Sequence, residues 1–145
     1  MARESALWTR MKNGVKDLRF LGYPIDLQRL ENEVAAGHPD VEGCIDGAQV
    51  WIELKSELRP VRATTPIHPK VRDSQRDWHR DRCKAGCRCN WVLLQVGEGS
   101  AASLYLIPGR HYEDIVATEA TLQTLSCVGP NDAMGHVLLT AALGW

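Results

Sequence analysis

Several features are scarce in this chain or missing from it. Its 145 residues contain no apolar run of membrane-spanning length, no internal repeat and no low-complexity tract. A transmembrane helix needs about 20 consecutive apolar residues, so none is expected. The five Cys are an odd number, which argues against a purely disulfide-bonded secreted scaffold. The opening residues Met1 to Glu4 lack the apolar segment of a signal peptide, so residence in the cytoplasm is the default expectation.

The composition that is present indicates one globular domain. Size predicts a single domain over residues 1–145, and a 44% hydrophobic fraction with five Trp suits a packed core. Ser74 and Asp77 resemble a capping box, which would start a helix that ends near Gly86. Periodicity and turn residues predict these elements: a helix at 3–18, a strand at 25–31, a mobile loop at 57–73, strands at 91–96 and 103–107, and a helical C-terminal extension over 110–145 that includes a helix at 112–125.

An Asp-Gly pair at positions 46 and 47, between two alternating runs, predicts a β-hairpin. Both central residues of the favoured two-residue turn need positive φ. In the resulting register Asp40 lies opposite Glu53, and Lys55 points to the same side. A three-residue loop with a bulge would break this register. The apolar face then carries Val41, Ile45, Ala48, Val50, Ile52 and Leu54, and the polar face carries Asp40, Glu42, Cys44, Gln49, Trp51, Glu53 and Lys55.

The two opposed acids need a physical reason. Opposed Cβ atoms in antiparallel strands lie about 5 Å apart, and like charges at that distance repel each other. A divalent cation between the carboxylates would reverse the sign of this interaction. Mg²⁺ fits, because it prefers hard oxygen ligands and keeps several waters that a substrate can displace. Lys55 could then contact a phosphate oxygen or an attacking water.

Short motifs around this hairpin are similar to those of a nuclease superfamily. Pro39-Asp40 and Glu53-Leu54-Lys55 resemble the two halves of the PD-(D/E)XK signature. Four strings resemble its phage-type branch, close to VRR-NUC domains and Holliday junction resolvases: Arg29-Leu30-Glu31-Asn32, Gly37-His38-Pro39-Asp40, Trp51-Ile52-Glu53-Leu54-Lys55 and Ser74-Gln75-Arg76-Asp77-Trp78. The resemblance covers roughly the first two thirds of the chain. It implies an α/β fold with a restriction-endonuclease-like core, in which helices flank a mixed central sheet.

The same resemblance implies a metal-dependent deoxyribonuclease. Mg²⁺ would be the cofactor, Mn²⁺ would substitute for it, and no organic cofactor is expected. Asp40 and Glu53 would bind the metal, with the backbone carbonyl of Leu54 as a third ligand. Lys55 would orient the attacking water or stabilise the transition state. Gln75 would hydrogen-bond the water, Lys55 or a neighbouring phosphate.

Two further acids have an open role. Glu4 matches, by its order and facing, a Glu that superfamily members bring to the metal from the first helix. The alternative is that Glu4 only complements the helix dipole. Whether Glu31 joins the site is also left open.

The net charge of −1 conceals a basic band. Residues 55–88 hold ten Lys and Arg against four acids, a charge of +6, and the remainder carries −7. A basic segment beside an acidic metal site suits a DNA backbone held near a cation. The alternative is a solvated helix face with local ion pairs. The candidate DNA-binding residues are Arg59, Arg62, Lys70, Arg72 and Arg76.

The expected substrate is branched, flap or junction DNA, by analogy with the resembled proteins in a bacterial or phage-infected host cell. One small domain has little room for base-specific reading, which also favours selection by DNA structure. A rival reading is a non-catalytic nucleic-acid-binding or interaction domain that retains the nuclease scaffold. The intact Asp40, Glu53 and Lys55 argue against it.

Other segments leave alternatives open. His79, Cys83 and Cys87 would share a helix face near Cys89, which allows a zinc-binding regulatory domain, but no CxxC pair is present and reduced thiols are the preferred reading. The apolar segment 137–145 either forms a subunit contact in a homodimer or caps the core.

Overall fold

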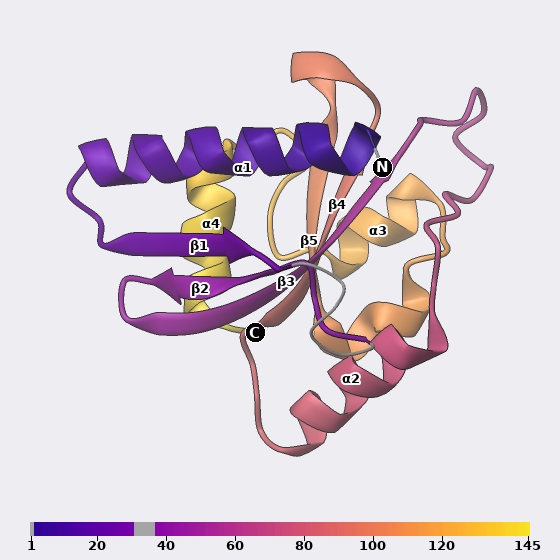
Figure 1. Ribbon diagram of the computed structural model, residues 1–145. Coiled ribbons are helices and arrows are strands. Elements are labelled where there is room, and N and C mark those ends of the chain that lie inside the picture. Colours follow the sequence, from indigo (N-terminus) through magenta and orange to yellow (C-terminus); the bar gives the residue numbers. More distant parts are fainter. Residues whose placement is uncertain (1, 31–36) are drawn as a thin grey trace.

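The computed structural model describes residues 2–30 and 37–145. One five-stranded sheet forms its centre, with helices on both faces (Figure 1). The strands are β1 (Ile25–Arg29), β2 (Val41–Ile45), β3 (Ala48–Glu57), β4 (Asn90–Val96) and β5 (Ser103–Pro108). The α-helices are α1 (Ala2–Phe20), α2 (Asp73–Lys84), α3 (Glu119–Leu125) and α4 (Met134–Leu143). Two 3₁₀ helices are η1 (Gly99–Ala101) and η2 (Gly109–Asp114).

Strand order in the sheet follows the chain, from β1 to β5. β3 and β4 are parallel and are connected through α2, whereas the other neighbouring strands are antiparallel. The sheet is therefore mixed, which confirms the predicted α/β class with a mixed central sheet flanked by helices. Among the helices of residues 2–30 and 37–145, none combines the length and apolar character needed to cross a membrane.

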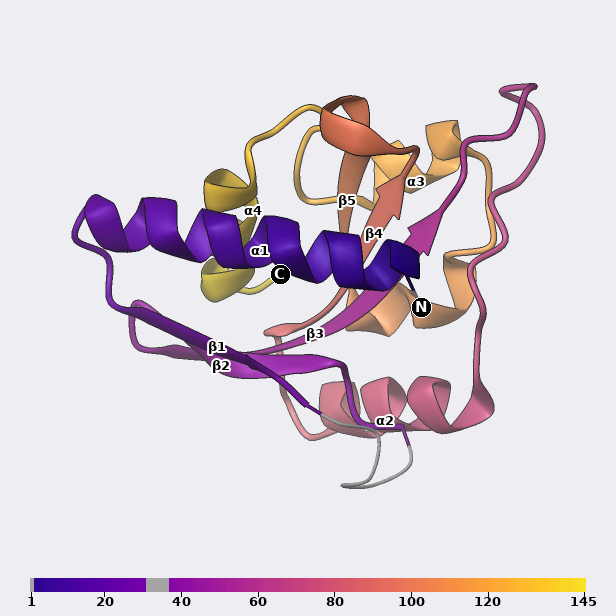
Figure 2. The same ribbon diagram turned by 45° about the horizontal axis from the view of Figure 1, so that its top comes forward.

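Two apolar clusters lie on opposite faces of the sheet. The first joins α1 and α4 to the inward side chains of the hairpin, such as Val50 and Ile52. The second joins η2 and α3 to alternate residues of β4 and β5, such as Leu94 and Tyr105. Figure 2 shows α1 and α2 on opposite sides of the sheet. Every residue of β4 is buried, as expected for a strand whose two faces are both covered.

The predicted hairpin and its register are confirmed. Asp46 and Gly47 form the turn with φ values of 49° and 85°. Ile45 pairs with Ala48, and the pairing continues back to Val41 opposite Ile52. It ends one pair short of the predicted Asp40 and Glu53, because Asp40 lies just before β2. Most of the predicted apolar face packs against α1 and α4, because all of its side chains except that of Ala48 belong to the first cluster. Ala48, next to the turn, is only partly buried.

β3 continues past the place where β2 begins. β2 contacts β3 only as far as Ile52, whereas β4 pairs with β3 from Trp51 to Glu57. Within the described part of the chain, residues 53–57 of β3 therefore pair with a strand on one side only. We use the name fork for residues 53–57 of β3 together with Asp40, which lies just before β2.

The start of α2 differs from the prediction. Arg72 is the N-cap residue and no side chain caps the helix, so the predicted capping box of Ser74 and Asp77 is wrong. Ser74 lies inside the first turn, where its hydroxyl is not placed to accept from the first free N–H groups. The end of the helix follows the prediction, because Gly86 comes directly after the C-cap with φ of 96°.

The single helix predicted at 112–125 is two separate elements, η2 and α3. Thr118 starts the second, since its Oγ1 accepts a hydrogen bond from the Thr121 N–H at 3.4 Å. Just before it, Ala117 forms an isolated antiparallel bridge with Ile67. Pairing with a distant segment, which local periodicity does not reveal, thus interrupts the helix.

The C-terminal apolar segment caps the core of its own chain. Met134, Val137, Leu138 and Ala141 of α4 are buried in the first cluster. α4 packs mainly against α1, β2 and β3, and its Ala141 carbonyl accepts from the Trp91 Nε1 of β4 at 2.9 Å. Its apolar face is thereby used within the chain, and no longer serves as an argument for a homodimer.

Gly43 of β2 marks a place where β1 and β2 leave no room for a side chain. A Cβ at Gly43 would overlap the backbone of Asp26 and Leu27 on β1. We expect Gly43→Ala to lower the free energy of unfolding by about 2 kcal/mol, because β1 must move away. Urea denaturation measures this loss.

Gly135→Ala in α4 is the matched control. A Cβ there meets only Leu18, at an ordinary contact distance of 3.4 Å. Replacing Gly by Ala at a helical position with room for the methyl group should leave stability unchanged or raise it. If Gly43→Ala were as stable as this control, the close approach of β1 and β2 would be wrong.

Candidate active site

Asp40 closes the fork in place of a backbone hydrogen bond. In the hairpin register the residue opposite Leu54 is Pro39, which lies before the start of β2. The Asp40 Oδ2 atom instead accepts from the Leu54 N–H at 2.8 Å. The Leu54 carbonyl faces the same side of β3 as its N–H, and Pro39 has no N–H to donate to it. A carboxylate and a carbonyl therefore lie together on the open side of β3.

Glu53 is the buried acid of the pair. It is 1% exposed, and its Oε1 accepts from the Gln75 Nε2 at 2.5 Å. The other oxygen, Oε2, is buried without a hydrogen-bond partner among the described residues. Burial, followed by the negative charge of Asp40, raises the pKa of Glu53 well above its usual range, and the charge of Lys55 offsets this in part. A buried acid beside a second acid is unfavourable unless a positive charge joins them.

The side chain of Lys55, on β3, extends toward Gln75, which also contacts Glu53. Its Nζ donates to the Lys70 carbonyl at 2.6 Å and to the Gln75 Oε1 at 3.0 Å. Burial lowers the pKa of Lys55, while the nearby acids, Glu53 first, act in the opposite direction. An ammonium group has three donors, so one N–H of Lys55 remains for a further acceptor.

Gln75 and Tyr112 complete the buried network. The start of α2 brings Gln75 against the fork, as the sequence motif predicts. Tyr112 was not identified from the sequence: its hydroxyl donates to the Gln75 Oε1 at 2.5 Å and accepts from the Arg72 N–H at 3.1 Å. Burial raises the pKa of Tyr112 to about 12, so the hydroxyl keeps its proton at neutral pH. No sequence signal pointed to it, because Tyr112 lies in a 3₁₀ helix that was predicted as regular α-helix.

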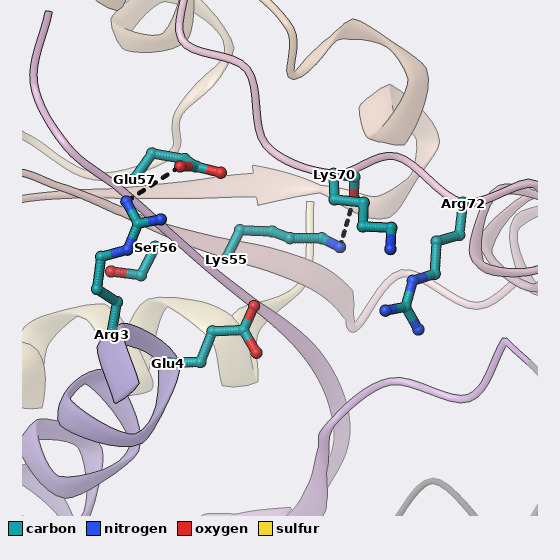
Figure 3. A pocket seen from close by; sticks show the side chains of 7 residues that line it. All are labelled: Arg3, Glu4, Lys55, Ser56, Glu57, Lys70 and Arg72. Atoms are coloured by element: carbon teal, nitrogen blue, oxygen red, sulfur yellow. Dashed lines mark hydrogen bonds and ion pairs between the residues drawn. The ribbon is translucent and has the colours of Figure 1, made fainter. Parts of the chain in front are cut away.

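A pocket of about 200 Å³ opens beside Lys55 (Figure 3). Its lining comes from α1, the end of β3 and the segment before α2: Arg3, Glu4, Lys55, Ser56, Glu57, Lys70 and Arg72. Glu4 points toward Lys55 in Figure 3, and its charge acts on both Lys55 and Glu53. Arg3, which the sequence reading missed, pairs with Glu57 at 3.3 Å. Glu31, the other acid left open, lies outside the described residues.

The donor set at the fork fits a hard divalent cation. Asp40 and Glu53 supply carboxylate oxygens, Leu54 supplies a carbonyl, and one Glu53 oxygen is buried without a protein partner. Across residues 2–30 and 37–145, no three His, Cys, Asp or Glu side chains cluster as a ready ligand group. A cation here would therefore be coordinated by two carboxylates, and carbonyl, water or substrate oxygens would complete its coordination shell. Mg²⁺ is commonly bound in this way.

The predicted DNA-binding residues divide into two groups. Lys70 and Arg72 line the pocket. Arg59 instead bonds Glu119 at 2.7 Å and Ser103 at 2.8 Å, and so ties the segment after β3 to the sheet. Arg76 forms ion pairs with acids around the start of α2 and η2, namely Asp73, Asp77 and Glu113. Arg62 is exposed and lines a different pocket, beside Arg59.

In the described part of the chain, the side chains of His79, Cys83, Cys87 and Cys89 do not come together as a group of three metal ligands. His79 is buried, and its Nδ1 lies 3.0 Å from the Asn90 Nδ2. Burial, and then the charge of Lys55, lowers the pKa of His79 to about 4, so the ring is neutral. Trp78 is half-buried and packs edge-on against Trp51, with ring centres 5.5 Å apart.

No known family model matches this sequence and no curated protein matches it significantly, so function is inferred from the site and the short motifs.

The raised pKa of Glu53 predicts a pH-dependent stability. Without divalent cations, the folded protein binds one more proton than the unfolded chain from about pH 4.5, the ordinary Glu value, up to the raised pKa. Over that window the free energy of unfolding falls as pH rises. Glu53→Gln is always neutral and should escape this loss. Urea denaturation in EDTA, at several pH values, compares the two proteins.

We expect the stability advantage of Glu53→Gln to grow with pH and to level off above the raised pKa. Glu57→Gln is the matched control on the same strand, where Glu57 is partly exposed and paired with Arg3. If the curves of wild type and Glu53→Gln stayed parallel across the range, Glu53 would titrate normally in the fold.

Proposed function

We propose that this protein is a divalent-metal-dependent endonuclease of PD-(D/E)XK type that hydrolyses phosphodiester bonds in DNA. The observation that carries the proposal is the meeting of Asp40 and Glu53 at the fork, with one buried Glu53 oxygen free of hydrogen bonds from the described residues. The side chain of Lys55 points to the same face of the sheet as that of Glu53, and both contact Gln75. These residues stand in the positions that the motif resemblance assigns to metal binding and catalysis.

Asp40, Glu53 and the Leu54 carbonyl would hold Mg²⁺ or Mn²⁺. Such a cation, when bound, activates water and offsets the charge that develops on the scissile phosphate. The two carboxylates are preorganised for the cation, because the Leu54 N–H donates to Asp40 and the Gln75 amide donates to Glu53. Fixed ligands do not have to reorganise during the reaction, which favours catalysis.

Lys55 would supply a positive charge to the reacting phosphate or direct the attacking water. Two of its three N–H groups contact Lys70 and Gln75, and the third is available. The low exposure of Lys55, 6%, keeps water away from this charge and strengthens its effect. Gln75 would hold Lys55 and Glu53 at a fixed separation.

DNA would approach through the pocket lined by Arg3, Lys70 and Arg72. These cations lie beside Lys55, where a phosphate backbone needs neutralising charge. Phosphate contacts carry no sequence information of their own. By analogy with the resembled proteins, we propose that the enzyme selects DNA by its structure, such as a flap, branch or junction.

Loss of either acid should abolish cleavage and spare DNA binding. We expect Asp40→Asn and Glu53→Gln to lower the single-turnover rate by at least about 100-fold, because each removes a charge that holds the cation. Lys55→Ala should lower the rate more than it weakens binding. The assay uses linear, nicked, flap and four-way DNA with Mg²⁺, Mn²⁺ or EDTA, at saturating protein.

Glu42→Gln is the matched control for these variants. Glu42 lies on the same polar face of the hairpin, but its carboxylate accepts from the Gln49 side chain at 2.9 Å and, among the described residues, is not part of the Lys55–Gln75 network. It should cleave at the wild-type rate. Wild-type cleavage by Asp40→Asn or Glu53→Gln would refute the ligand assignment. Tight DNA binding by wild type without cleavage in either metal would favour the non-catalytic nucleic-acid-binding alternative.

The two groups of basic residues should behave differently. Arg72→Ala should weaken binding to every DNA and lower the slope of log K against log salt by about 1, since it removes one phosphate contact. Arg59→Ala should lower the urea midpoint instead, because Arg59 ties Glu119 and Ser103 to the segment after β3. Salt titrations and denaturation curves of both variants test this. An unchanged salt slope in Arg72→Ala would remove Arg72 from the DNA interface.

A further inference from the structure

The side-chain amide of Gln75 lies between three partners, and these fix its orientation. Its carbonyl accepts from Lys55 at 3.0 Å and from the Tyr112 hydroxyl at 2.5 Å. Its NH₂ group donates to Glu53. Lys55 can only donate and an ionised Glu53 can only accept, so the flipped amide would face both with the wrong group. The orientation of the Gln75 amide therefore decides whether Lys55 meets an acceptor and Glu53 meets a donor.

Lys55 alone is a weak anchor for the Gln75 carbonyl. It is a flexible side chain, and in the proposed reaction its ammonium also serves the phosphate or the water. Tyr112 is held much more firmly. It is 1% exposed, and the ring of His79 stacks on it with centres 5.3 Å apart and an angle of 20° between the planes.

The hydroxyl of Tyr112 is used fully. It donates its single proton to Gln75 and accepts the backbone N–H of Arg72, the N-cap residue of α2. A tyrosine hydroxyl can make both bonds at once. The same group thus sets the Gln75 amide and ties the start of α2, where Gln75 lies, to η2.

We propose that Tyr112 is a positioning residue for the active site, which holds the Gln75 amide so that its N–H points at Glu53 while Lys55 acts on substrate. This role rests on the proposed nuclease function. Tyr112 acts through Gln75, and it contacts neither of the two acids by a hydrogen bond.

The test removes the hydroxyl alone. Tyr112→Phe should lower the single-turnover rate at saturating DNA by about tenfold, the size of effect expected for one lost buried hydrogen bond. DNA affinity should stay within about twofold, since no phosphate contact is lost. Tyr105→Phe is the matched control: Tyr105 is equally buried, but its hydroxyl bonds Glu119. It should cleave at the wild-type rate.

A double variant separates positioning from a general loss of stability. If Tyr112 acts through Gln75, the pair Tyr112→Phe and Gln75→Ala should be no slower than Gln75→Ala alone. The proposal would be overturned if the fall in single-turnover rate of the double variant equalled the product of the falls in the two single variants. A wild-type rate in Tyr112→Phe would also overturn it.

A second readout does not depend on cleavage. The side-chain NH₂ signals of Gln75 in a ¹⁵N-¹H NMR spectrum are assigned by their absence in Gln75→Ala. In Tyr112→Phe they should shift and exchange faster with solvent, whereas in Tyr105→Phe they should not move. Unmoved signals in Tyr112→Phe would overturn the positioning role. If wild type cuts no DNA but the signals move as expected, the nuclease proposal fails and the control of Gln75 by Tyr112 stands.

Discussion

The hydrogen bond from the Leu54 N–H to Asp40 is the contact around which the candidate site is arranged. It exists because β2 begins only after Pro39, which leaves β3 without a strand partner on that side. Asp40 takes the place of the missing backbone acceptor and is thereby held beside Glu53. A tight turn, a proline and the difference in length between two strands together place like charges in contact. Burial and the charge of Asp40 raise the pKa of Glu53, which reflects the cost of this arrangement, and a divalent cation would relieve it.

The rest of the molecule packs around the fork and buries Glu53, Lys55 and Gln75. The first apolar cluster fixes the hairpin against α1 and α4, so the register that opposes the two acids cannot slip without exposing the core. On the other face, α2 and η2 supply Gln75 and Tyr112 from segments far apart in sequence. Lys70 closes the network through its carbonyl. Lys55 donates to Lys70 and Gln75, whereas the Glu53 Oε2 and the Ser56 Oγ are buried without a hydrogen-bond partner among the described residues.

Much of the hairpin and its polar face could be predicted, because a two-residue turn and a period of two fix the register locally. Gln75 was found through a short motif at the start of a helix. Tyr112 was not found, since the break between η2 and α3 depends on the pairing of Ala117 with Ile67, fifty positions earlier in the chain. The same reason applies to Arg59: its charge suggested DNA, but its partner Glu119 is distant in sequence. Local patterns predict local geometry, and the partners of side chains are decided by the tertiary fold.

Cation binding by the two acids is the central claim, and manganese titration followed by electron paramagnetic resonance measures it without any DNA. The loss of the free Mn²⁺ signal counts bound ions per chain. The account predicts about one ion at the fork for wild type, unchanged binding in Glu42→Gln, and greatly weakened binding in both Asp40→Asn and Glu53→Gln. The account would be contradicted if wild type bound no Mn²⁺, or if Asp40→Asn and Glu53→Gln bound Mn²⁺ as tightly as wild type does.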